Sequence, residues 1–183
     1  MRIAPIGCLF PCDDLEGLAA YVFRISEATH KTDVALGGAG MVAAAVSAAL
    51  DGRSWEGIMD AAMDCYAMAA RYGAQTYSAS PKARLALALE LARRHRADPE
   101  ALSLSVYEGI GTTTLMNEAV PTALAMAYYF KEPHACSLAC ANLGGDTDTI
   151  GAMAVAVCGA KAGAAAMDPA LIAVLEQSND VDF

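Results

Sequence analysis

The chain has 183 residues, of which 56% are hydrophobic and 18% are charged, and its 21 acidic and 12 basic residues give a net charge of −9. This composition excludes a disordered chain, because the apolar side chains are sufficient to build a core. The acidic excess argues against a nucleic-acid-binding surface, which needs lysine and arginine for its phosphate contacts. No run reaches the roughly 18 uninterrupted apolar residues of a membrane span, so no membrane partner is expected either.

Nearly every long segment is rich in alanine, leucine and methionine, with apolar residues at helical spacing and little β-branched alternation. We therefore predict an all-α, single-domain bundle of roughly nine helices, with boundaries uncertain by about 2–4 residues. In chain order the predicted helices cover residues 13–29, 32–50, 54–71, 80–95, 98–108, 119–130, 133–142, a segment opening at the turn 146–149, and 168–176.

Several of these boundaries rest on recognisable start and stop signals. Ser54, Ser80-Pro81 and Asp98-Pro99 are typical N-caps, with proline in the first turn of the last two helices. Asp51-Gly52 ends the second helix. Pro121 is expected in the first turn of its helix, where the missing N–H would cost nothing.

The low proportion of charged residues also bears on assembly. A monomer of this size normally carries more surface charge, so much apolar surface is expected to face either another subunit or a missing part of the same fold. No signal peptide is recognisable and most of the cysteines have apolar, alanine-rich neighbours, which predicts a cytoplasmic protein with free thiols. The cysteines are Cys8, Cys12, Cys65, Cys136, Cys140 and Cys158.

The most informative segment is the acidic turn, residues 142–151, with the sequence NLGGDTDTIG. Gly144 and Gly145 allow a sharp turn, and Asp146, Asp148 and Thr149 follow it at the start of an apolar helix. Two carboxylates held close together repel each other, and a hard divalent cation such as Mg²⁺ would relieve that repulsion. The same residues are also ordinary helix-capping residues, so the pattern alone leaves both metal binding and capping open.

Four segments resemble the ADP-ribosylglycohydrolase family, in the family's order and over nearly the whole chain. Residues 143–151 (LGGDTDTIG) resemble the family's C-terminal signature, and residues 1–7 (MRIAPIG) resemble its mid-chain Met-Arg-Ile-Ala-Pro segment. Thr29-His30 is similar to its Thr-His pair, and Asn117-Glu118-Ala119-Val120-Pro121 is similar to its Glu-Ser-Val-Pro helix start. The family's upstream Gly-Asp-Ala-Leu-Gly and Thr-Asp-Asp-Thr segments have no counterpart in residues 1–183, so the chain resembles only the C-terminal portion of such a domain.

The resemblance implies an all-α fold with a two-metal Mg²⁺ or Mn²⁺ centre whose ligands come from both halves. Asp146, Asp148 and Thr149 would be the downstream ligands. The upstream ligands and the carboxylate that handles the water have no counterpart here, so no catalytic residue is assigned. His30 and the loop residues Gly109 and Ile110 would contact substrate, although a histidine at a helix end also commonly bonds free carbonyls.

These implications lead to one expected function and one alternative. The expected function is metal-dependent hydrolysis of an ADP-ribosyl glycosidic bond, with ADP-ribose or an ADP-ribosylated molecule as substrate and a complementary N-terminal chain required. Such a bond breaks through a cation-like transition state at the ribose anomeric carbon. The alternative is a non-catalytic helical binding or assembly module of the same fold, which would cover its exposed face by self-association.

Overall fold

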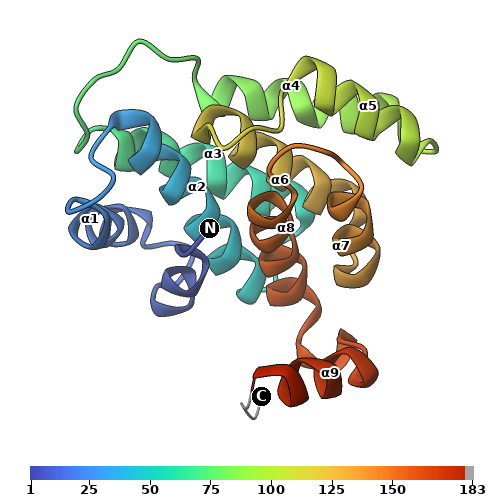
Figure 1. The fold of residues 1–183 in the computed structure, drawn as a ribbon. Coiled ribbons are helices and arrows are strands. Elements are labelled where there is room, and N and C mark those ends of the chain that lie inside the picture. Colours follow the sequence, from blue (N-terminus) through green and yellow to red (C-terminus); the bar gives the residue numbers. More distant parts are fainter. Residues whose placement is uncertain (180–183) are drawn as a thin grey trace.

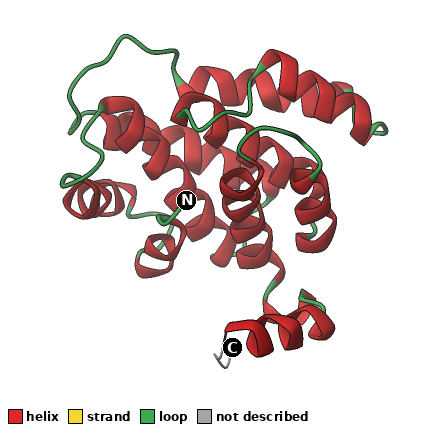
Figure 2. Ribbon diagram, viewed as in Figure 1, coloured by secondary structure: helices red, strands yellow, loops and turns green. Residues whose placement is uncertain are grey.

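The computed structural model describes residues 1–179, which form nine α-helices, two short 3₁₀-helices and no strand (Figures 1 and 2). This confirms the predicted all-α bundle; residues 180–183, the end of the predicted unit 1–183, lie outside the described residues. The elements are η1 (Ala4–Leu9), α1 (Leu15–Ser26), α2 (Asp33–Leu50), α3 (Trp55–Ala70), α4 (Pro81–Arg94), α5 (Pro99–Gly109), α6 (Met116–Phe130), α7 (Pro133–Ala141), α8 (Thr147–Ala162), η2 (Ala164–Ala166) and α9 (Pro169–Asn179).

Helix α2 is the centre of the bundle. It is buried from Val34 to Ala49, apart from the half-buried Ala35, and packs against η1, α1, α3, α6 and α8. Its glycines permit this crowding: a Cβ added to Gly40 would lie 2.7 Å from the Cβ of Ala69 on α3. By length and hydropathy alone α2 could cross a bilayer, but 83% of it is buried inside the protein, as expected of a core helix.

The predicted N-caps are present. Ser54 Oγ accepts a hydrogen bond from the Gly57 N–H at 3.1 Å, and a carboxylate oxygen of Asp98 accepts one from the Ala101 N–H at 3.0 Å. Such bonds satisfy N–H groups that the first helical turn leaves without partners. The prediction ran past the end of α1, which stops at Ser26 rather than at residue 29.

Helix α6 begins at Met116, three residues before the predicted start, so the expectation of Pro121 in the first turn is wrong. Proline inside a helix leaves the carbonyl four residues earlier without its usual N–H donor. Here that carbonyl belongs to Asn117, and it accepts a hydrogen bond from Arg84 Nη1 of α4 at 3.1 Å. A donor from a different helix therefore stabilises the arrangement, and local sequence could not reveal it.

Helix α9 differs from the other eight α-helices because none of its residues is buried. In Figure 1 it lies apart from the main body, beyond α8 and the short η2. Its apolar side chains Leu171, Val174 and Leu175 are 46%, 59% and 47% exposed. The chain thus presents an apolar helix face that no described part of the same chain covers.

Candidate functional site: an acidic turn beside a pocket

The acidic turn joins α7 to α8. Gly144 and Gly145 both adopt positive φ, at +84° and +77°, a conformation that L side chains rarely adopt. Asp146 is the N-cap residue of α8, and Asp148 and Thr149 lie in the first helical turn. The glycine pair thus reverses the chain immediately before the residues predicted to bind metal.

A second loop fixes the position of this turn. The Asp146 N–H donates a 2.7 Å hydrogen bond to the carbonyl oxygen of Thr112, which is 4% exposed. A Cβ on Gly145 would overlap both this carbonyl and the Thr112 hydroxyl. Only glycine can therefore bring the acidic turn this close to residue 112. Gly109 and Ile110 were predicted to lie in a loop, but no local signal predicted a role for Thr112.

The acidic side chains are not used for capping. Asp146 makes no side-chain cap hydrogen bond, so the capping interpretation fails for that residue. Within residues 1–179, no hydrogen bond or ion pair engages the side chains of Asp148 and Thr149. The first turn of α8 therefore presents carboxylate and hydroxyl oxygens that have no partner in the described chain.

This donor set fits a hard divalent cation. Mg²⁺ is commonly held by one or two carboxylates together with water molecules, so two aspartates and a threonine hydroxyl are compatible with it. No group of three or more His, Cys, Asp or Glu side chains that could hold a metal occurs among residues 1–179. The remaining ligands would have to be water or groups from outside this part of the chain.

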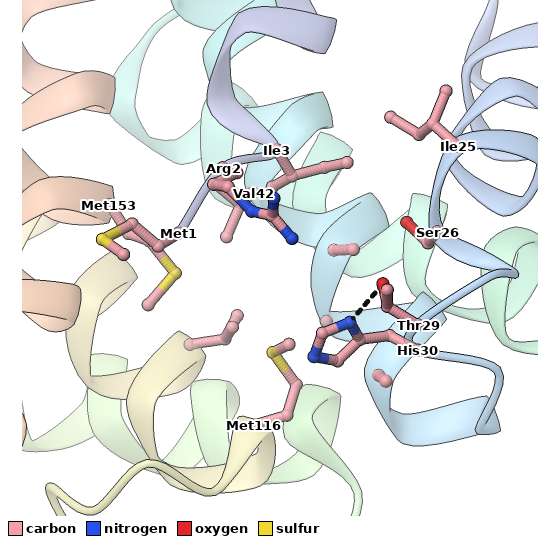
Figure 3. Close-up of a pocket in the computed structure, with 14 residues that line it drawn as sticks. Met1, Arg2, Ile3, Ile25, Ser26, Thr29, His30, Val42, Met116 and Met153 are labelled. Atoms are coloured by element: carbon pink, nitrogen blue, oxygen red, sulfur yellow. Dashed lines mark hydrogen bonds between the residues drawn. The ribbon is translucent and has the colours of Figure 1, made fainter.

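A pocket of about 440 Å³ lies between the N-terminal segment and α1, α2, α6 and α8. Its polar side chains are those of Arg2, Ser26, Thr29 and His30, and the rest of its lining is largely apolar. His30 follows α1, and its Nδ1 is 2.9 Å from Thr29 Oγ1. In Figure 3 the Arg2 and His30 side chains extend into the same space from opposite sides. The His30 ring is therefore hydrogen-bonded to the Thr29 hydroxyl and not to a free carbonyl at the helix end.

The pocket adjoins α8, the helix that the acidic turn opens, at Met153. Asp146, Asp148 and Thr149 themselves do not line the pocket. The structure thus brings His30 and Arg2 together on one pocket, which the helix that carries the acidic residues also lines.

Gly109 and Ile110 lie away from the pocket lining, at the end of α5. Gly109 is exposed, with open space around it, whereas the Ile110 side chain is 2% exposed and belongs to the core. Only backbone groups of this pair could therefore contact a ligand. Tyr107 is nearer to the acidic turn: it is 50% exposed, and a Cβ on Gly144 would lie 3.2 Å from its ring.

Comparison with known proteins agrees with this arrangement of helices and motifs. Residues 1–182 match the ADP-ribosylglycohydrolase family, and the chain belongs to that family. It is 44% identical over 185 residues to the protein named "Uncharacterized protein YegU" of Escherichia coli (strain K12). That alignment covers 100% of this chain and 55% of YegU, so the chain spans about half the length of the curated relative. The family predicted from the four sequence segments is confirmed.

Proposed function

We propose that the chain supplies the downstream part of a metal-dependent site that hydrolyses an ADP-ribosyl glycosidic bond. The observation that supports this most is the free carboxylate and hydroxyl oxygens at the start of α8, next to a pocket with basic side chains. Membership of the ADP-ribosylglycohydrolase family supports this reaction class. The linkage in question joins the ribose anomeric carbon of ADP-ribose to another molecule.

In this proposal Asp146, Asp148 and Thr149 hold a divalent cation, Mg²⁺ or Mn²⁺, in a centre that takes two metals by resemblance to the family. A bound cation of this kind polarises substrate oxygens and lowers the pKa of water. The chain itself orients these ligands. The turn at Gly144 and Gly145 sets the direction of the aspartates. The hydrogen bond from Asp146 to the Thr112 carbonyl holds the turn in position.

The pocket is proposed to bind the ADP-ribosyl group. Arg2 offers a guanidinium for a phosphate, because its fork of N–H donors matches phosphate oxygens. His30 and Thr29 offer nitrogen and hydroxyl groups for ribose oxygens. The Gly109–Ile110 backbone, which does not line this pocket, is proposed to contact the substrate on the basis of the family resemblance alone.

Completion of the site is proposed to require a further segment. The part of the relative outside the matched region is 45% of its length, which is 100% minus the matched 55%. A complementary chain of that kind would supply the remaining metal ligands and the group that handles the water. For this reason we assign no catalytic acid or base within residues 1–183.

Calorimetric titration with MgCl₂ and MnCl₂ tests the metal part of the proposal. We expect the wild-type chain to bind, and we expect Asp146→Asn and Asp148→Asn to weaken binding by at least about tenfold. Asp60→Asn, which removes an exposed carboxylate from α3, is the control and should change nothing. Equal affinities in all four proteins would rule out the acidic turn as a metal site.

Release of ADP-ribose tests the reaction. The chain is combined with a separately produced segment that corresponds to the unmatched part of the relative, and substrates linked through arginine, serine or a base are supplied with Mg²⁺. Turnover that disappears with Asp148→Asn supports the proposal. If the assembled protein binds Mg²⁺ but releases nothing from any substrate, the hydrolase assignment is wrong.

The exposed apolar face of α9 favours a second candidate, a non-catalytic assembly module. A second copy of the chain would cover Leu171, Val174 and Leu175 and remove them from water. Sedimentation equilibrium distinguishes this candidate: a dimer that dissociates in the double variant Leu171→Lys, Leu175→Lys supports it, whereas a monomer at all concentrations counts against it.

A further inference from the structure

We propose that Glu118 is a positioning residue, which holds the acidic turn in place through the threonine loop, defined as Gly111 to Thr113. The effect of Glu118 on cation binding rests on the proposed function. Its effect on the position of the acidic turn concerns the metal-free chain alone. Glu118 lies in the first turn of α6, and within residues 1–179 no hydrogen bond or ion pair joins it to Asp146. Its effect is transmitted by hydrogen bonds along the backbone of the loop.

A backbone hydrogen bond joins the loop to the turn. The Thr112 carbonyl oxygen accepts from the Asp146 N–H at 2.7 Å. Asp146 has no side-chain cap bond, and this hydrogen bond fixes the N-cap residue of α8 from outside the helix. Any shift of Thr112 is therefore passed directly to the residue that carries the first carboxylate.

Helix α6 holds the loop on both sides of Thr112. Before it, the Gly111 carbonyl accepts from Thr122 Oγ1 at 2.8 Å. After it, Glu118 Oε2 accepts from Thr113 Oγ1 at 2.7 Å and from the Thr113 N–H at 3.2 Å. A Cβ on Gly111, where φ is +98°, would overlap the Glu118 carboxylate, so the loop fits closely around that group.

The charge of Glu118 is itself balanced from α4. Arg84 Nη1 is 3.5 Å from Glu118 Oε1, and the two side chains are only 30% and 16% exposed. Partial burial by itself raises the pKa of Glu118, but the hydrogen bonds from Thr113 and the Arg84 charge outweigh it, so the pKa lies below its ordinary value. The carboxylate is therefore ionised at neutral pH, and an ionised acceptor makes the stronger hydrogen bonds.

A purely structural role makes different predictions from a positioning role. A glutamate in the first turn of a helix also interacts favourably with the helix dipole. If this were the only role of Glu118, its loss would lower overall stability without a local effect on Asp146. Glu56, in the first turn of α3, is a matched control: it accepts a 3.2 Å hydrogen bond from Tyr128 but has no connection to the threonine loop. Glu118→Gln and Glu56→Gln change the charge equally.

The experiment measures amide hydrogen exchange by NMR in the metal-free chain. Glu118→Gln is expected to speed exchange at Asp146 by roughly tenfold while the Ile150 amide, one turn further into α8, keeps its rate. Glu56→Gln should alter neither amide. An unchanged Asp146 rate, or a uniform acceleration of all α8 amides, would overturn the inference.

Two further measurements keep the outcome decisive. Thr113→Val at an exposed position removes one donor to Glu118 and is expected to reproduce the effect if Glu118→Gln fails to fold. In Mg²⁺ titrations Glu118→Gln should weaken binding by roughly tenfold with Asp146 and Asp148 intact. If the wild-type chain binds no Mg²⁺, the proposed function fails while the exchange rates still decide the role of Glu118. If the wild-type chain and Glu118→Gln bind Mg²⁺ equally well, only the positioning role fails.

Discussion

Replacement of Gly145 by alanine should damage the acidic turn more than any ordinary loop substitution. The residue has φ +77°, and an added Cβ would overlap the carbonyl oxygen and hydroxyl of Thr112. The carbonyl is backbone and accepts the Asp146 N–H bond, so it cannot turn aside without breaking that bond. The substitution therefore combines conformational strain with the loss of a specific contact.

The magnitude follows from these two parts. A left-handed conformation costs an alanine about 1–2 kcal/mol. Loss of the Asp146–Thr112 hydrogen bond costs about 1 kcal/mol more, so Gly145→Ala should lower the free energy of unfolding by about 2–3 kcal/mol. Gly52→Ala isolates the first part, because Gly52 has φ +75° and nothing within 4 Å of an added Cβ.

Urea unfolding, monitored by circular dichroism and extrapolated linearly to water, measures both variants. Gly145→Ala should be less stable than Gly52→Ala by about 1 kcal/mol, and it should also lose affinity for Mg²⁺ while Gly52→Ala keeps it. Equal losses of stability in the two variants would show that the contact between the turn and Thr112 contributes nothing to the free energy of unfolding, and would refute this prediction.

Three other predictions concern stability, pH and thiol chemistry. Gly159→Ala, inside α8 with open space around it, should stabilise the protein by about 0.5–1 kcal/mol and raise the thermal midpoint by a few degrees; a lower midpoint would contradict this. The pKa of Glu118 is lowered from its ordinary value of 4.5, so its contribution to stability is present above pH 4.5 and is lost as the pH falls through the folded-state pKa. The stability difference between wild type and Glu118→Gln should therefore shrink in acid unfolding below that pH, and a constant difference would refute the linkage. Burial, with a smaller effect from Glu16, raises the pKa of Cys65 to about 12, whereas Cys8 is exposed. Alkylation mapped by mass spectrometry should modify Cys8 in the folded protein and Cys65 only after unfolding; early modification of Cys65 would show that the α2–α3 interface opens.

Much of the fold could be predicted because its signals are local. Helical periodicity and cap residues such as Ser54 and Asp98 act within one turn of the chain, and the structure has both caps as predicted. The start of α6 could not be predicted in this way. It depends on Arg84, which lies 33 residues away from Asn117 and replaces the donor that Pro121 lacks.

For the candidate site, the residue pattern was enough to identify the family and to single out the residues proposed to bind metal. Gly144, Gly145 and the two aspartates are adjacent in the chain, so their shared turn follows from local backbone rules. Tertiary structure decided what surrounds them: it brought Thr112 to the Asp146 N–H and placed His30 and Arg2 on one pocket. These pairs are separated by tens of residues, and only the packing of α6, α8 and the N-terminal segment around α2 brings them together. Periodicity and capping describe neighbours along the chain, whereas a binding site consists of neighbours in space.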